Sequence, residues 1–232
     1  MAPIAVAGEA GASELRVEPI LLELNAPAAA GTLILRNDEN ADVIVQTRVF
    51  RWAQVNGQET LIPTTDVVAS PPQVRLASYA NYTVRIVRTS KQPVQGEESY
   101  RIVVDQLPRT EQKTQVSVRF LLRQLIPVFF RAQQLAPAKV SWSLTRERDT
   151  IVATASNAGD ERLRIASLSL RDGAGSSVGF GNALVGYVLG RSSMNFVVTK
   201  VPPKFGAAGP VRIDAVSNVG PISAAAPLQP RR

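Results

Sequence analysis

The stretch from Val116 to Phe130, VSVRFLLRQLIPVFF, constrains the fold most, because it has the composition of a β-strand yet carries apolar residues on both faces. β-Branched and aromatic residues dominate it, and it contains no glycine. By the period-two rule one face is wholly apolar and consists of Val116, Val118, Phe120 and Leu122. The opposite face mixes arginines with leucines, Leu121 among them. Apolar residues on both faces need cover on both faces.

Two interpretations of this stretch remain open. In the first it is the central strand of a β-sandwich, with a few exposed arginines. In the second it is an edge strand whose spare apolar row receives another chain by strand addition. The second interpretation predicts that Phe120 faces outward and that Leu121 points into the core of its own domain.

The rest of the chain predicts an all-β protein. Its 232 residues are 45% apolar, and 16 prolines and 15 glycines are spread between short apolar runs. Strand patterns before the 116–130 stretch occur at 15–24, 32–36, 43–52, 61–62, 67–69, 82–88 and 100–104. After it they occur at 140–144, 151–155, 163–170, 195–198 and 211–216, with glycine-rich turns between 172 and 190. We expect two immunoglobulin-like β-sandwiches, residues 13–131 and 132–227, joined near the linker-like segment 132–138.

The composition disfavours several function classes. The chain has no histidine and no cysteine, which removes the usual general base, the usual metal ligands and thiol chemistry. No paired carboxylates stand at a convergent spacing, so we expect no catalytic residues, no metal and no cofactor, and an enzyme is the weakest interpretation. The net charge is +7, but the arginines are scattered and only 6% of residues are aromatic, which argues against a nucleic-acid partner.

The ends of the chain say little about location. No apolar run approaches the ~18 residues that a membrane-spanning helix needs, so membrane insertion is not expected. The first twelve residues, MAPIAVAGEAGA, are small and apolar but lack the basic start and long apolar centre of a complete signal peptide. They are consistent with the end of a truncated signal and equally with an extension.

Seven short motifs in the first half occur in an order that resembles the periplasmic chaperones of the bacterial chaperone–usher pathway. They are Leu15-x-Val17-x-Pro19, Val45-Gln46-Thr47-Arg48-Val49-Phe50-x-Trp52, Asn56-Gly57, Ser70-Pro71-Pro72, Val84-Arg85-Ile86-Val87-Arg88, Glu98-Ser99-Tyr100-Arg101 with Leu107-Pro108, and Leu122-Arg123 with Ile126-Pro127-Val128-Phe129. Each motif alone is weak, but their order is specific. The set is most similar to the archaic branch, which handles pilins resembling spore-coat protein U.

The resemblance implies a fold, a function and partners. The two domains would form a boomerang with a cleft, and the last strand of the first domain would be donated to a pilin, a sandwich that lacks its final strand. The pilin-binding side chains would then be Val116, Val118, Phe120 and Leu122. The partners would be pilin subunits and an outer-membrane usher, and the location would be the periplasm, after removal or truncation of a signal peptide. Without a pilin the exposed strand favours self-association.

The chain departs from the family at the site that anchors the pilin. Many members hold the C-terminal carboxylate of the pilin with an arginine on the first strand and a lysine on the last strand of domain one. Here those positions are Pro19 and Pro127, and neither can bind a carboxylate. Strand parity offers Arg88 as a substitute, with Arg123 as a second candidate. The alternative for each is an ion pair within the protein or a place in solvent.

The family also commonly bridges its two domains with a glutamate, an arginine and an acidic residue. Glu98 and Arg131 match the first two positions, and Asn218 stands at the third. The resemblance therefore implies an interdomain contact in which a hydrogen bond replaces one charge. A tandem immunoglobulin-like structural or adhesin surface protein fits the composition equally well, but it does not explain the ordered motifs.

Overall fold

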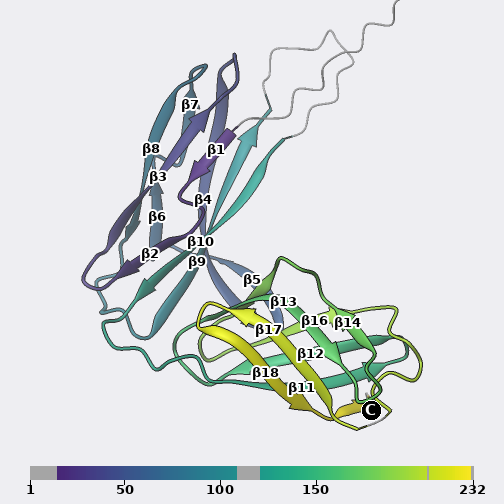
Figure 1. Cartoon of the computed structure of the whole chain (residues 1–232). Helices are drawn as coiled ribbons and strands as arrows, with labels where there is room; N and C mark the ends of the chain where they lie inside the picture. Colours follow the sequence, from purple (N-terminus) through teal and green to yellow (C-terminus); the bar gives the residue numbers. More distant parts are fainter. Residues whose placement is uncertain (1–14, 109–120, 208, 231–232) are drawn as a thin grey trace, which may run out of the picture.

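The computed structural model describes residues 15–108, 121–207 and 209–230, and within them every regular element is a β-strand. Figure 1 shows two β-sandwiches set at an angle, with the chain passing from the first to the second after β10. The prediction of an all-β chain with two sandwich domains is confirmed. No helix in the described ranges is long and apolar enough to cross a membrane.

The first domain packs two sheets against each other. One sheet has the order β1-β3-β8-β6, formed by Leu15–Glu18, Ala30–Asn37, Asn81–Arg88 and Val67–Ser70. The other has the order β2-β10-β9-β4-β5, formed by Leu22–Asn25, Arg123–Arg131, Glu97–Leu107, Val43–Val55 and Gln58–Pro63. A further strand, β7 (Gln73–Leu76), pairs with the first half of β4. Neighbouring strands are antiparallel except β2 and β10, which run parallel.

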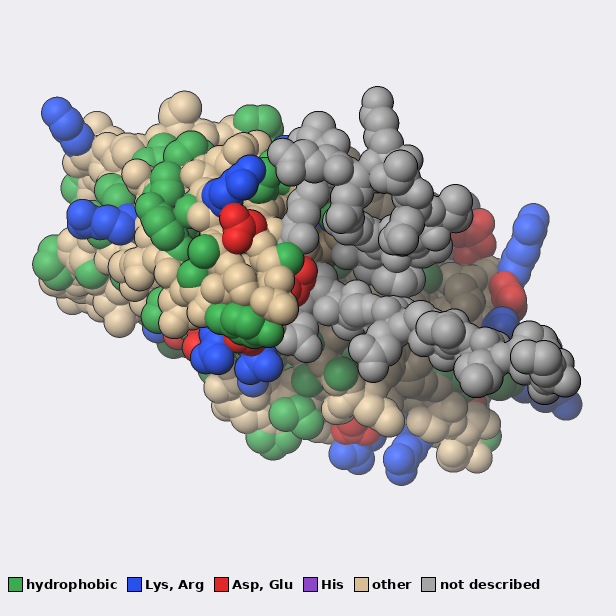
Figure 2. Space-filling view, turned by 90° about the horizontal axis from the view of Figure 1, so that it is seen from above, with side chains coloured by type: hydrophobic (Ala, Val, Ile, Leu, Met, Phe, Trp, Pro, Cys, Tyr) green, Lys and Arg blue, Asp and Glu red, His purple; other side chains and the backbone are tan. Residues whose placement is uncertain are grey.

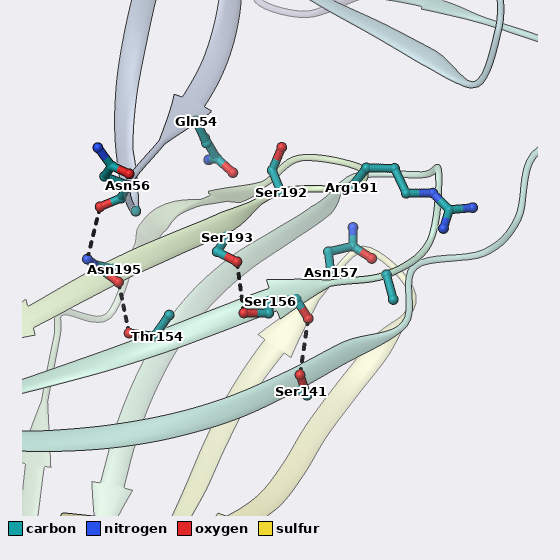
Figure 3. Close-up of a pocket in the computed structure, with 12 residues that line it drawn as sticks. Gln54, Asn56, Ser141, Thr154, Ser156, Asn157, Arg191, Ser192, Ser193 and Asn195 are labelled. Carbon is teal, nitrogen blue, oxygen red and sulfur yellow. Dashed lines mark hydrogen bonds between the residues drawn. The ribbon is translucent and has the colours of Figure 1, made fainter.

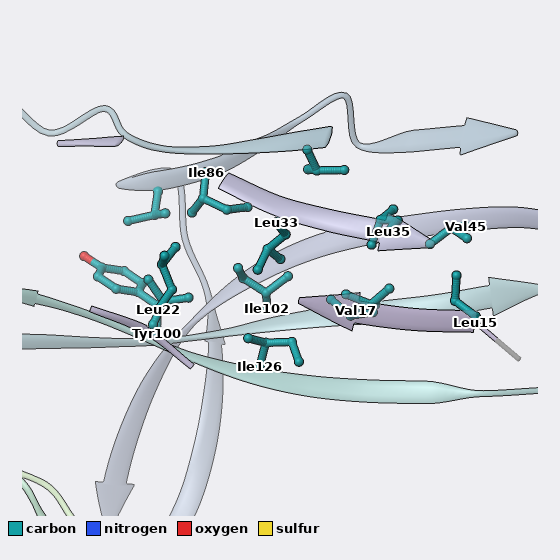
Figure 4. Close-up of a cluster of buried hydrophobic side chains, with 14 of the residues drawn as sticks. Leu15, Val17, Leu22, Leu33, Leu35, Val45, Ile86, Tyr100, Ile102 and Ile126 are labelled. Atoms are coloured by element: carbon teal, nitrogen blue, oxygen red, sulfur yellow. The ribbon is translucent and has the colours of Figure 1, made fainter. Parts of the chain in front are cut away.

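The outer strands of the first domain build its core by alternation, whereas the central strands β9 and β10 carry runs of consecutive buried residues. In β3, for example, Leu33, Leu35 and Asn37 are buried while the residues between them are exposed. Figure 4 shows the inward-facing side chains of both sheets meeting in one cluster. The labelled members are Leu15, Val17, Leu22, Leu33, Leu35, Val45, Ile86, Tyr100, Ile102 and Ile126. Burying one large apolar side chain contributes about 1.5–3 kcal/mol, so this cluster is what holds the two sheets together.

The second domain is a separate sandwich with its own core. One sheet has the order β16-β12-β11-β19, formed by Ser193–Val198, Thr150–Asn157, Val140–Glu147 and Leu228–Pro230. The other has the order β14-β13-β17-β18, formed by Ser177–Gly179, Leu163–Arg171, Val211–Ser217 and Gly220–Ala226, with β15 (Leu184–Val188) also pairing with β13. A second cluster of buried apolar side chains fills the space between these sheets.

The sequence underestimates this second domain in two places. The segment predicted to consist of glycine-rich turns, 172–190, contains the short strands β14 and β15, which both pair with β13. The expected end of the domain at residue 227 is wrong, because β19 (Leu228–Pro230) pairs with β11. With three residues each, β14 and β19 are too short to show an alternating pattern.

The Asn56-Gly57 turn forms the hairpin that its dipeptide predicts. Asn56 and Gly57 have φ values of 53° and 77°, and Val55 and Gln58 pair on either side of them. Positive φ at both central residues is what an Asn-Gly hairpin turn requires. This β4–β5 hairpin extends past the first sandwich and reaches the second domain, as Figure 1 shows.

Candidate functional site

The strand β10 has an open edge at its N-terminal half. Arg123 to Arg131 pair with β9 along their whole length, but on the other side the parallel pairing with β2 begins only at Val128. Among the described residues, 123–127 therefore have no strand on that side. Pro127 lies in this part, which agrees with the preference of proline for sheet edges. The edge-strand interpretation of the 116–130 stretch is thus the one that fits its described part.

Leu121 and Leu122, where the described part of the 116–130 stretch begins, face opposite to the predicted directions. Leu121 is 51% exposed, and Leu122 packs against the core of the first domain. The expectation that Leu121 enters this core, with Leu122 facing away from it, is wrong. The buried residues Ile126, Val128 and Phe130 set the phase, and counting back by twos places Leu122 on their side. Val116, Val118 and Phe120 lie outside the described residues.

Arg88 lies in an ion pair within the first domain. Its Nε and Nη2 donate to the two carboxylate oxygens of Glu98 at 2.8 and 2.7 Å, and its Nη1 donates to the backbone carbonyls of Ser90 and Gln92. The Arg88 side chain is almost fully buried, and the hydrogen bonds to Glu98 raise its pKa. Four of the five N–H groups of the guanidinium are thus used internally. Of the two alternatives for Arg88, the structure shows the internal pair, and this leaves it no free fork for a pilin carboxylate.

Arg123 shares one carboxylate with Arg48. The Nε of Arg123 lies 2.5 Å from one oxygen of Asp105, and Nη2 of Arg48 lies 2.6 Å from the other. Burial raises the pKa of the Asp105 carboxyl, but the hydrogen bonds from both arginines outweigh it and hold this pKa below its usual range. Both guanidinium groups remain accessible to solvent.

Sequence reasoning missed Arg101, a cation that contacts aromatic rings of both domains. It lies on β9 directly opposite Pro127 and, on the other side, opposite Phe50 of β4. Its guanidinium carbon is 3.6 Å from the centre of the Trp52 ring and 5.8 Å from that of Tyr187. Glu59 is its nearest carboxylate, at 3.6 Å, and burial lowers the pKa of Arg101. Its register with Pro127 could not be read before the pairing of β9 and β10 was known.

A charged cluster joins the two domains, although its members differ from those expected. Arg131 at the end of β10 contacts Glu97 and also Glu161 of the second domain. Arg162 of the second domain contacts Glu97 at 2.5 Å and also Glu23. The Arg131 position is therefore interdomain as predicted, but the expected partners Glu98 and Asn218 are wrong.

The alternation of side chains along β9 explains why Glu97, and not Glu98, contacts the second domain. Adjacent residues of a strand face opposite ways, so Glu98 turns to Arg88 inside the first domain while Glu97 turns to the second. Asn218 instead accepts a hydrogen bond from the backbone of Arg164, within its own domain. Burial raises the pKa of Glu97 to about 7, against the backbone N–H of Arg162 and the charge of Arg131, which lower it. Burial likewise lowers the pKa of Arg162 to about 10.

Aromatic packing and the β4–β5 hairpin complete the joint. Trp52 and Phe129 of the first domain pack against Tyr187 and Leu189 of the second. The Gln54 side chain donates to the carbonyl of Tyr187 at 2.7 Å and accepts from the N–H of Leu189 at 2.9 Å. Because both polar atoms of the Gln54 amide bond to the backbone of the second domain, they fix the hairpin relative to that domain.

At the tip of the hairpin the two domains pair through their backbones. Asn195 of β16 donates its N–H to the carbonyl of Gly57 at 2.9 Å. In Figure 3 the side chain of Asn195 lies between Asn56 above it and Thr154 below it, with a hydrogen bond to each. A Cβ added to Gly57 would lie 2.2 Å from Nδ2 of Asn195, so only glycine fits this approach.

The described Lys and Arg side chains form no large patch on the face seen in Figure 2. On the face seen in Figure 2 the Lys and Arg side chains project singly or in small groups around the described surface. No group of three or more acidic side chains that could hold a metal ion occurs in the described ranges.

A family model for the N-terminal domain of pili and flagellar-assembly chaperones (PapD N-terminal domain) matches residues 14–136, more than half of the chain. The chain belongs to this family of chaperones. The family resemblance predicted from the ordered motifs is therefore confirmed. No curated protein sequence matches the chain.

Solved structures of chaperones share the fold of this chaperone over nearly its whole length. One is the complex of CsuC with the tip adhesion subunit CsuE, from the archaic Csu pili of Acinetobacter baumannii. It has a TM-score of 0.69 at 22% identity and covers 94% of this chain and 99% of that one. The Salmonella enterica chaperone SafB, solved with the pilin SafA, has a TM-score of 0.61 at 16% identity, covering 93% and 97%. The E. coli chaperone DraB has a TM-score of 0.58 at 20% identity, covering 91% and 96%.

Proposed function

We propose that this chaperone holds a pilin subunit by donating residues 116–122 as a strand, and delivers it to an outer-membrane usher. The observation that carries the proposal is the open edge of β10 at residues 123–127, which leads directly into the apolar row Val116, Val118, Phe120 and Leu122. The proposed activity is binding, without a catalytic step. Two structural relatives, CsuC and SafB, were solved with a subunit bound, which supports a pilin as the partner here.

The side of the strand on which Leu122 lies indicates how the pilin would be held. Because Leu122 lies on the core side of β10, the period-two rule places Phe120, Val118 and Val116 on the same side of an extended strand. A pilin with an open groove would therefore continue the apolar core of the chaperone beyond the end of its sandwich. Each side chain buried there contributes about 1.5–3 kcal/mol, and ladder hydrogen bonds add affinity that does not depend on the pilin sequence.

We further propose Arg101 as the anchor for the C-terminal carboxylate of the pilin. It lies opposite Pro127, where the family resemblance places a lysine, and it presents its charge on the side of β9 that faces the second domain. Its contact with Glu59 is long, at 3.6 Å, and stacking on Trp52 fixes the plane of the guanidinium. A planar fork held in this way suits a carboxylate.

The test compares charge substitutions on either face of the proposed donor segment. Phe120→Glu places an unpaired carboxylate in a dry groove in the complex, so it should abolish pilin capture while the chaperone keeps its unfolding temperature. Arg119→Glu, on the opposite face, is the matched control and should still capture the pilin. Val128→Glu, inside the core, should unfold the first domain.

The measurements are thermal unfolding and co-purification with the pilin of the source cell. Capture of the pilin by folded Phe120→Glu at the wild-type level would reject strand donation by this face. A wild-type protein that polymerises and binds no pilin would instead favour the structural or adhesin alternative. A signal peptide, a periplasmic location and transfer to the usher belong to the same proposal and are tested by fractionation and by usher binding of the loaded complex.

A further inference from the structure

A recess of about 470 Å³ lies beside the base of β10, outside the interdomain joint. The charged residues of its polar wall are Arg48, Asp105 and Arg123, with Gln46 and Gln106 beside them, and Leu121 and Leu122 form part of its apolar wall. The three charged residues lie on β4, β9 and β10, which are neighbours in one sheet, so the ladder hydrogen bonds fix the position of this wall.

The polar wall carries an excess positive charge. Two guanidinium groups face one carboxylate, at 2.6 Å from Arg48 and 2.5 Å from Arg123. Asp105 is buried, whereas the Arg48 and Arg123 side chains are 45% and 64% exposed. The buried Asp105 carboxylate thus fixes both arginines, and the net charge of the three side chains is +1.

Each arginine also keeps hydrogen-bonding capacity. A guanidinium has five N–H groups. Arg48 uses Nη2 and Arg123 uses Nε toward Asp105, and within the described part of the chain neither guanidinium donates a further hydrogen bond. Two adjacent forks with free donors, fixed by a shared anion, are suited to a second carboxylate.

The residues on either side of Arg123 indicate what carries that carboxylate. Leu121, Arg123 and Leu125 alternate on the outer face, and the two leucines are 51% and 48% exposed. This face presents an apolar, a cationic and an apolar position at a spacing of about 6.6 Å. An extended segment with the pattern apolar-x-acidic-x-apolar would match it in both charge and register.

We propose that this recess is a specificity site for the pilin, and that it binds an aspartate or glutamate side chain on an extended pilin segment flanked by apolar residues. The inference rests on the proposed function, because the segment is that of the pilin held by the donated strand. The site adds a charge requirement to an interaction whose ladder bonds are otherwise insensitive to sequence.

The first experiment uses the whole chaperone with its pilin. Arg48→Gln/Arg123→Gln should release the pilin about tenfold faster than wild type at low ionic strength, with the gap closing at about 0.5 M NaCl. The matched control is Arg16→Gln/Arg36→Gln, which removes the same two charges from an equivalent arginine pair on Asp38 of the other sheet. Equal release rates for the two double variants would overturn the proposal.

A second experiment does not depend on the pilin. The side-chain Nε–H signals of Arg48 and Arg123 are followed by NMR during titration with the peptide Ac-Leu-Thr-Asp-Thr-Leu-NH2 and with its Asn counterpart. The Asp peptide should shift both signals, and the Asn peptide should not. Equal shifts with both peptides, or none, would overturn the inference even where pilin capture succeeds. Failure of the wild type to capture pilin, with the Asp-specific shifts present, would reject the proposed function and keep the acid-binding site.

Discussion

Arg162 is the residue whose loss should damage the interdomain joint most. Its side chain is buried, its guanidinium carbon lies 3.6 Å from the centre of the Phe129 ring, and it contacts Glu97 and Glu23. Arg162→Ala leaves the fully buried Glu97 with Nε of Arg131, 3.4 Å away, as its remaining cation. Removing one partner of a buried ion pair costs about 3–5 kcal/mol.

The expected effect is large enough to measure. For a chain of this size 1 kcal/mol corresponds to roughly 2–4 °C in unfolding temperature, so a loss of about 3 kcal/mol should lower it by about 6–12 °C. Calorimetry should also show the two domains unfolding in separate transitions. Arg164→Ala is the control, since its side chain is exposed and should change stability by less than about 0.5 kcal/mol.

The pH dependence of this variant follows from Glu97. Burial raises the pKa of Glu97 to about 7 in the folded protein, above its usual 4.5. Because the folded pKa is raised, the contribution of protonated Glu97 to stability is fully present below the unfolded value of 4.5. It is lost as pH rises through the folded value of about 7. Without Arg162 this pKa rises further, so the deficit of Arg162→Ala should be larger at about pH 8 than at about pH 5. Adding Glu97→Gln should recover part of the loss. A deficit no larger than that of Arg164→Ala, or one independent of pH, would refute the reasoning.

Three further predictions concern the hairpin, the anchor and Asp105. Gly57→Ala should undock the hairpin and widen the angle between the domains in small-angle X-ray scattering, whereas Gly175→Ala, at a similar positive φ with open space around it, should leave the angle unchanged. Arg101→Gln should weaken pilin capture with little loss of stability, whereas Arg88→Ala should destabilise the first domain because it leaves Glu98 without its ion-pair partner. Normal pilin capture by Arg101→Gln together with lost capture by a stable Arg88→Ala would reject Arg101 as the anchor. Asp105 has a folded pKa below its usual 3.8, so its contribution to stability is present above pH 3.8 and is lost as pH falls through the folded value. The difference in stability between wild type and Asp105→Asn should therefore vanish at low pH. A difference that persists there would contradict the pairing of Asp105 with the two arginines.

The sequence predicts most of the first domain because its strands are long and alternate. The runs 43–52 and 82–88 show the period of two clearly, and Asn56-Gly57 specifies its turn locally. Short strands such as β14 and β19 leave no such pattern, since their position depends on the partner strand.

The site was harder to predict because it depends on phase and register. In the stretch 116–130 both rows are apolar, so composition alone does not reveal which row faces the core. Only the packing of Ile126, Val128 and Phe130 in the core cluster of the first domain settles it, since Phe129 of the other row is equally buried but packs at the interdomain joint. A one-residue difference in facing also separates Glu97, which joins the domains, from Glu98, which does not. Arg101 became visible only through its pairing with Pro127.

Amide hydrogen exchange across residues 116–122 tests the central claim most directly. It is measured on the free chaperone and on the complex with its pilin. If the segment is donated as a strand, its amides should become as strongly protected in the complex as those of β10, while the core of the first domain changes little. A stable complex in which these amides exchange as fast as in the free chaperone would show that the pilin is held elsewhere, and would contradict the account.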